Sequence, residues 1–253
     1  MSYGEEVKEY FGKYFNREFT NVLCPKNGSF NYSGLFDKFL KSTIIDCPDM
    51  FFVDEKTKTI YIFEHFQIDS SKHTKKGSQS KAEIAVDNKK YEERAALCSP
   101  TNPEVEYYSS LKAQSSVKYY FDSLKQLFDK HKSSINEYKD HVLKITHNNQ
   151  SDWDFFITFV IEDGSVFGSI CYDKKLLFPT TIKEFMDIFR SQNDVDCLIC
   201  SNFFNESRCT WAISKEDQNK MCCSEKKLSQ IELVEFNPQT LGFSLFIPKE
   251  KIK

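Results

Sequence analysis

Two acidic residues, Asp49 and Glu64, are candidates for a pair of carboxylates at a catalytic site. Asp49 precedes the apolar run 50–53, and Glu64 lies inside a second β-rich run, residues 59–69. Strand alternation in that run places Glu64 on the same face as three isoleucines and Phe66. Burying a carboxylate there is costly unless a positive charge meets it, and a divalent cation shared with Asp49 would meet that need. Two carboxylates around Mg²⁺ could then activate water for phosphodiester hydrolysis.

Two β-rich runs must position this pair. They are joined by the short polar turn 54–58, and this pattern predicts a β-hairpin. Helices are predicted over residues 5–19, 33–41, 81–97, 108–142 and 180–190, the last capped by Thr180 or Thr181. Further strands are predicted over residues 154–162, 166–172, 195–204, 210–214, 231–236 and 242–247, and a loop over 70–81.

This mixture of strands and helices predicts an α/β (mixed α+β) fold, with a central mixed sheet flanked by helices. The polar stretch 147–151 is the best candidate for a boundary. It separates a region 1–148, which holds the hairpin and helices, from an α/β region 149–253. We expect the two regions to pack as one globular unit.

The order of these features resembles the PD-(D/E)xK nuclease superfamily, which has the restriction-endonuclease-like fold. That pattern has an acid-bearing helix, Pro-Asp at a strand start, acid-x-Lys in the hairpin strand, and a further helix. Here the corresponding features are the helix 5–19 with Glu5, Glu6 or Glu9, then Pro48-Asp49, the strand with Glu64, and the helix after residue 81. The resemblance covers roughly residues 1–98. It implies that Asp49 and Glu64 are catalytic ligands of Mg²⁺ or Mn²⁺.

The sequence departs from this pattern at Phe66, which stands two residues after Glu64 where the family has its lysine. Phenylalanine cannot stabilise charge at a scissile phosphate. Either Lys72, Lys75 or Lys81 reaches in from the following loop or helix, or Gln67 substitutes weakly, or the site is inactive. Lys72 is the catalytic candidate that we carry forward.

A basic segment follows the hairpin and is the second candidate feature. Its members, Lys72, Lys75, Lys76 and Lys81, are interleaved with serine, threonine, glycine and glutamine. Such side chains can contact phosphates without reading bases, so DNA or RNA is the expected partner. The net charge of −3 means that nucleic acid would have to be held by such a local patch. The plain alternative is a solvated surface, because Asp87, Glu92 and Glu93 lie close by.

Composition argues against several other classes. With 8 glycines in 253 residues and no glycine-rich phosphate loop, kinase, P-loop and dinucleotide-binding functions are disfavoured. No apolar run approaches the roughly 18–20 residues that span a bilayer, so no membrane partner is expected. The acidic amino terminus lacks the apolar stretch of a secretory signal. We therefore expect the protein in the cytoplasm, or in that of the host cell if a phage encodes it.

The nine cysteines suggest a third possibility, a zinc-stabilised binding module. Its ligands would come from Cys197, Cys200, Cys209, Cys222 and Cys223. The first two cysteines lie in an apolar strand, however, where alternation places them on opposite faces. Cysteine in such a strand is more often a small buried hydrophobic residue than a ligand.

The sequence thus predicts a nucleic-acid-binding protein with a divergent, metal-dependent nuclease-like site, acting in phage defence or counter-defence. The alternative is a non-catalytic protein that inhibits or partners a nucleic-acid enzyme, with tyrosine and phenylalanine as interface anchors. Residues 64–72, 75–78 and 159–163 are also similar to segments of proteins from low-GC bacteria and their mobile elements. That likeness implies no activity.

Overall fold

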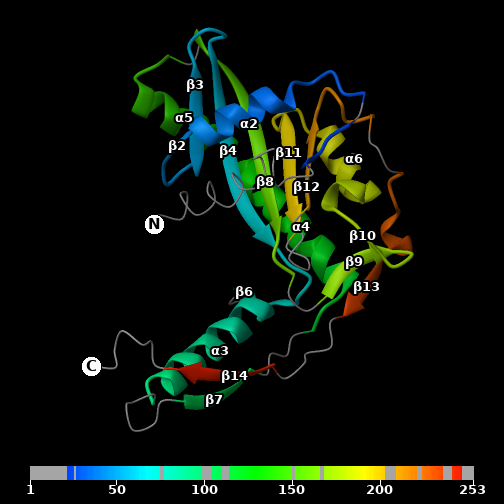
Figure 1. Cartoon of the computed structure of the whole chain (residues 1–253). Helices are drawn as coiled ribbons and strands as arrows, with labels where there is room; N and C mark the ends of the chain where they lie inside the picture. Colours follow the sequence, from blue (N-terminus) through cyan, green and yellow to red (C-terminus); the bar gives the residue numbers. More distant parts are fainter. Residues whose placement is uncertain are drawn as a thin grey trace.

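The computed structural model in Figure 1 describes most of the chain. The described residues are 22–25, 27–74, 77–97, 104–109, 114–149, 152–165, 168–202, 209–220, 224–235 and 241–246. The helix predicted over residues 5–19, with Glu5, Glu6 and Glu9, lies outside them. So do Lys75 and Lys76 of the basic segment.

A seven-stranded mixed sheet forms the centre of the molecule, with strand order β1-β12-β11-β8-β4-β3-β2. In sequence order the strands are β1 (Val22–Leu23), β2 (Thr43–Ile44), β3 (Met50–Asp54), β4 (Thr59–Ile68), β8 (Asp154–Asp163), β11 (Cys197–Asn202) and β12 (Cys209–Ser214). Neighbouring strands β4, β8 and β11 run parallel, whereas β2, β3 and β4 form an antiparallel meander. The predicted fold class, mixed α+β with a central mixed sheet flanked by helices, is confirmed.

The predicted hairpin is confirmed as β3 and β4, paired from Met50 with Phe63 to Asp54 with Thr59. Strand β4 then pairs with β8 along its whole length, from Thr59 with Asp154 to Ile68 with Asp163. Strands from both sides of the polar stretch 147–151 therefore share one sheet.

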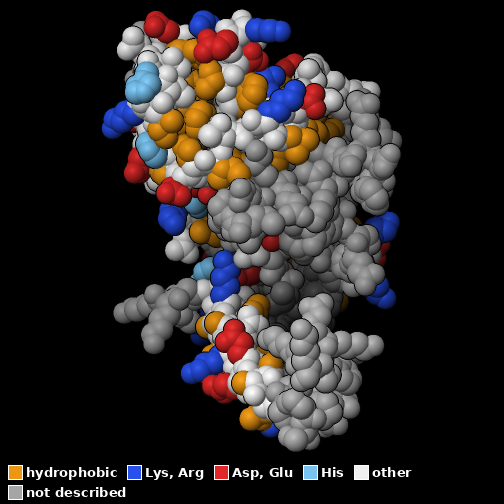
Figure 2. All heavy atoms as spheres, turned by 60° about the vertical axis from the view of Figure 1, so that its left-hand side comes forward, with side chains coloured by type: hydrophobic (Ala, Val, Ile, Leu, Met, Phe, Trp, Pro, Cys, Tyr) orange, Lys and Arg blue, Asp and Glu red, His pale blue; other side chains and the backbone are white. Residues whose placement is uncertain are grey.

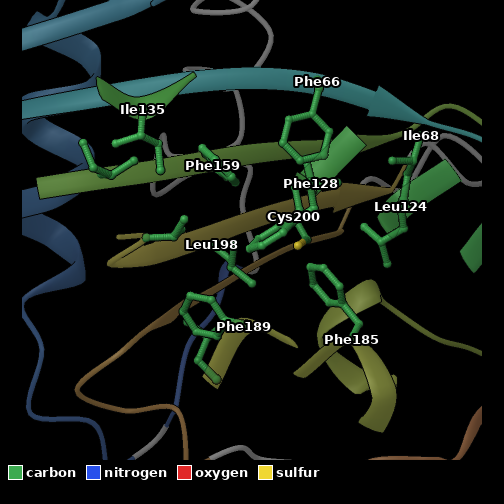
Figure 3. Packing of buried hydrophobic residues seen from close by; sticks show 14 of the residues in the cluster. Phe66, Ile68, Leu124, Phe128, Ile135, Phe159, Phe185, Phe189, Leu198 and Cys200 are labelled. Atoms are coloured by element: carbon green, nitrogen blue, oxygen red, sulfur yellow. The ribbon is translucent and has the colours of Figure 1, made fainter. Parts of the chain in front are cut away.

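Helices cover both faces of this sheet. On one face α4 (Val117–Ser133), α5 (Ile135–Thr146) and α6 (Lys183–Ser191) enclose the larger apolar core. Figure 3 shows Phe66 and Phe159 from the sheet and Phe128 and Phe185 from the helices packed within it. On the other face α2 (Tyr32–Lys41) packs Leu35 and Phe39 into a smaller core around Phe63. The faces of β4 alternate as the sequence predicted.

Three predicted local features are wrong. Residues 108–142 are not one helix, because β7 (Glu104–Ser109) comes first and Ser134 separates α4 from α5. The predicted loop 70–81 contains the short strands β5 (His73–Thr74) and β6 (Gly77–Ser78). Neither Thr180 nor Thr181 caps α6. Both lie in the 3-10 turn η2 (Pro179–Thr181), where the Thr181 hydroxyl bonds back to the Phe178 carbonyl.

An extension stands apart from the central sheet (Figure 1). It consists of α3 (Gln79–Ala95) and the two-stranded sheet of β7 and β14 (Leu241–Phe246). The Ser78 side chain caps α3, so the helix begins two residues earlier than predicted. A separate three-stranded sheet joins β9 (Gly168–Tyr172), β10 (Lys175–Leu176) and β13 (Glu232–Glu235). None of the described helices is both long and apolar enough to cross a membrane.

Candidate functional site

Asp49 and Glu64 are brought together by the β3–β4 hairpin. The Asp49 backbone N–H donates a hydrogen bond to Glu64 Oε2 at 3.2 Å. The His65 backbone N–H in turn donates to Asp49 Oδ2 at 2.7 Å. Helix α5 fixes the approach to Asp49, because the His141 ring bonds to the Cys47 carbonyl. Hydrogen bonds from backbone N–H groups thus hold the Asp49 and Glu64 carboxylates close together.

Two side chains from the covering helices converge on Glu64. His131 Nδ1 of α4 lies 2.7 Å from Glu64 Oε1, and the Tyr138 hydroxyl of α5 donates to the same oxygen at 2.9 Å. The Glu64 side chain is only 9% exposed, and that of His131 only 13%. The buried carboxylate thus has the hydrogen-bond partners that make its burial tolerable.

The electrostatics of the pair follow from burial and from its two like charges. Burial, then the nearby Glu64 charge, raises the pKa of Asp49 to about 6. Burial and Glu64 also raise the pKa of Tyr138 far above its usual value, so the Tyr138 hydroxyl remains a donor at neutral pH. A carboxyl pair that repels itself in this way would be stabilised by an added positive charge.

Phe66 occupies the place where the resemblance requires lysine, and its ring stacks on His131. The ring centroids are 4.8 Å apart and the planes differ by 6°. Phe66 also meets Phe159 edge to face at 5.6 Å, so it belongs to the core. The stack nevertheless brings a ring that can carry positive charge to the side of Glu64. His131 continues the apolar face of α4 after Leu124 and Phe128, which is the one sequence signal that marks it.

The lysines expected near the carboxylates do not reach them. Lys72 and Lys81 are both exposed, and within the described residues neither forms an ion pair with Asp49 or Glu64. Lys81 lies in the first turn of α3, in the extension. Figure 2 shows one side of the molecule, on which the Lys and Arg side chains of the described residues, including those of α3, are interspersed with Asp and Glu. The described basic residues therefore form no single-sign patch in this view.

Asp49 and Glu64 meet the minimum for Mg²⁺, which proteins commonly bind through one or two carboxylates together with water and substrate phosphate. Among the described residues, Asp49 accepts a hydrogen bond on one of its two oxygens, Oδ2, which leaves Oδ1 able to face an ion. Across the described residues, however, no group of three or more His, Cys, Asp or Glu side chains is placed to hold a metal. The two carboxylates alone would have to hold the ion.

The other face of β4 carries a separate polar group. His65 Nε2 lies 3.0 Å from Glu162 Oε2 of β8, and Gln67 donates to the second Glu162 oxygen at 3.2 Å. This group ties β4 to β8 directly behind the Asp49–Glu64 pair. Gln67 points away from that pair and is not placed to substitute for the missing lysine.

Cys197 and Cys200, two of the zinc ligands suggested by the sequence, lie within the described residues and do not come together. Cys197 packs in the smaller core and Cys200 in the larger one, on opposite faces of β11. Burial raises the pKa of both thiols, as expected of cysteines that act as small apolar side chains. Cys222 and Cys223 lie outside the described residues.

Comparison with known proteins assigns no family. No family model, no curated protein and no solved structure matches this chain.

Proposed function

We propose that this chain is a divergent member of the PD-(D/E)xK superfamily that binds nucleic acid and cleaves its phosphodiester bonds with a divalent metal ion. The juxtaposition of Asp49 and Glu64, with His131 stacked over Phe66, carries this proposal. A role in phage defence or counter-defence remains part of the same hypothesis.

The order of elements supports the proposal. Helix α2 precedes the antiparallel meander β2-β3-β4, and helices α4 and α5 lead to β8, which pairs parallel to β4. Asp49 stands directly before β3 and Glu64 within β4, as the resemblance implies. Burial and the nearby Glu64 charge raise the pKa of Asp49, so a cation bound beside Asp49 would relieve this unfavourable interaction.

Each residue of the site has a role that its contacts suggest. Asp49 and Glu64 would hold Mg²⁺ or Mn²⁺, which when bound would act as a Lewis acid and lower the pKa of attacking water. Tyr138 and the Asp49 N–H orient the Glu64 carboxylate. His131, which contacts Glu64, would take the part that lysine has in the family pattern. Lys72 and Lys81 would contact phosphates of the bound nucleic acid that lie away from the cleaved bond.

The first prediction tests this activity. Purified protein is incubated with single- and double-stranded DNA and RNA plus Mg²⁺ or Mn²⁺, and products are resolved on denaturing gels. We expect cleavage by the wild type, none by Asp49→Asn, and a loss of about 100-fold or more in His131→Gln. Asp37→Asn removes an exposed carboxylate of α2 and should cleave like the wild type. Absence of wild-type cleavage, or equal cleavage by Asp49→Asn, contradicts the proposal.

A second candidate function, a non-catalytic interaction protein, is favoured by one observation. Glu64 already receives hydrogen bonds on both oxygens from within the chain, which is typical of a structural carboxylate. Binding without cleavage, measured by gel shift or by pull-down of a nucleic-acid enzyme, would support this alternative. The cleavage assay separates the two functions, because an interaction protein gives no metal-dependent products.

A further inference from the structure

Helix α3 is far less buried than α4, although both helices have 17 residues. Only Ser80 of α3 is buried, whereas α4 buries Tyr120, Leu124 and Phe128 among others. A helix in a protein gains most of its stability by packing an apolar face against another element. Helix α3 contacts β7 within the extension, away from the central sheet (Figure 1). The rest of its surface is open to a partner.

The two sides of α3 differ in exposure. At 3.6 residues per turn, the buried Ser80 shares one side with the half-buried Ile84 and Asp87. The opposite side, which we call the outer stripe, is exposed at every position and comprises Ala82, Ala85, Val86, Lys89, Glu93 and Ala96. Figure 2 shows hydrophobic side chains among charged ones along the described part of the extension.

The outer stripe has the spacing of a surface that packs against a second helix. Its members recur every three or four residues, so they form one line along the helix. Val86 is 54% exposed, and Leu97, beside the end of the stripe, is 53% exposed. The three alanines would let another helix approach closely. The apolar positions at both ends of the stripe flank one charged pair, Lys89 and Glu93.

The charges of α3 indicate what kind of partner fits. Residues Gln79–Ala95 include four Lys or Arg and four Asp or Glu, so the helix has no net charge to attract nucleic acid. On the outer stripe, Lys89 Nζ lies 4.0 Å from Glu93 Oε1, and the two side chains are 78% and 65% exposed. One positive and one negative charge a turn apart are complementary to the same pair running in the opposite direction. The stripe is therefore complementary to itself, as an interface with two-fold symmetry requires.

We propose that the outer stripe binds a second copy of this chain, with the two α3 helices antiparallel about a two-fold axis. Each Lys89 then pairs with the partner's Glu93. The same register sets Val86 opposite the partner's Ala96 and keeps the two copies of Lys89 apart. Contact along a helix of about 25 Å buries less surface than a standard interface, so we expect a weak dimer with a Kd on the order of 10–100 µM. This dimer does not depend on the Asp49–Glu64 site.

Sedimentation velocity of the full-length protein, at concentrations on either side of that Kd, tests the proposal. We expect the wild type to pass from monomer to dimer as its concentration rises. Lys89→Glu and Glu93→Lys each bring like charges together in both symmetric pairs, so each variant alone should dimerise at least about tenfold more weakly. An equal mixture of the two variants restores an opposite charge in both pairs. It should form heterodimers with an affinity close to that of the wild type.

A matched control makes the same kind of change on another helix. Asp122→Lys alters the exposed Lys118–Asp122 pair of α4, which has the same spacing, and should dimerise like the wild type. A wild type that stays monomeric, single variants that dimerise like the wild type, or a mixture that restores no association overturns the proposal. If the wild type stays monomeric and Lys89→Glu weakens a gel shift with DNA or RNA, the outer stripe binds nucleic acid instead.

Discussion

Asp163→Asn is expected to make the protein more stable at pH 7, by up to about 3 kcal/mol. Burial raises the pKa of Asp163 from 3.8 to about 6, with the nearby Asp69 charge adding to the effect. A carboxyl whose pKa is higher in the folded state stabilises the fold while it is protonated. That contribution is fully present below about pH 4 and is lost as the pH rises through about 6. Asparagine keeps the shape of the side chain without its charge.

Urea unfolding at several pH values between 4 and 8 measures this effect. The wild type should lose stability between about pH 4 and 6 from Asp163, and Asp49 should contribute over the same window, because its pKa is also raised to about 6. Asp163→Asn should retain only the Asp49 contribution. As a control, Asp154→Asn changes an exposed carboxylate at the start of β8 and should follow the wild type. An Asp163→Asn profile that matches the wild type would show that Asp163 has no raised pKa in the folded protein.

Phe66→Lys, the substitution that would restore the family's lysine, is expected to lower the free energy of unfolding by at least about 3 kcal/mol. Phe66 is 4% exposed and stacks on His131, so lysine would leave a cavity and place a charge within it. Loss of the stack would also release His131 from its place beside Glu64. We therefore expect no gain in cleavage from the restored lysine.

Chemical denaturation of Phe66→Lys beside a matched substitution checks this expectation. Leu40→Lys makes the corresponding change on α2, where the side chain is 42% exposed, and should stay close to the wild type. If Phe66→Lys unfolds at the wild-type denaturant concentration, then Phe66 does not have the packing role that the structure gives it. Higher cleavage in this variant would instead show that the site still accepts lysine.

The hairpin could be predicted from the sequence because its information is local. Alternation in residues 59–69 fixes which side chains share a face, and the Asp49–Glu64 contact follows from the short turn between the strands. His131 and Tyr138 could not be found in this way. They lie 67 and 74 residues from Glu64, on two helices whose break at Ser134 the apolar pattern does not reveal.

The two lysines and Asp163 illustrate the same limit. Lys72 and Lys81 follow Glu64 closely in sequence, but β5, β6 and the cap at Ser78 turn the chain into the extension and leave both lysines exposed. Asp163 ends a strand that the sequence does predict. Its proximity to Asp69 depends on the pairing of β4 with β8, which is set by tertiary packing rather than by local pattern.

That pairing also has a kinetic consequence. Residues that face each other across β4 and β8 are 95 positions apart in the chain, as Gln67 and Glu162 are. Closing so long a loop costs entropy before any contact repays it, so this step should be slow in folding. Until β8 arrives, the inner edge of β4 offers its backbone groups to any other extended chain. A chain released before β8 is synthesised would carry Glu64 on the open edge strand β4, where self-association competes with completion of the fold.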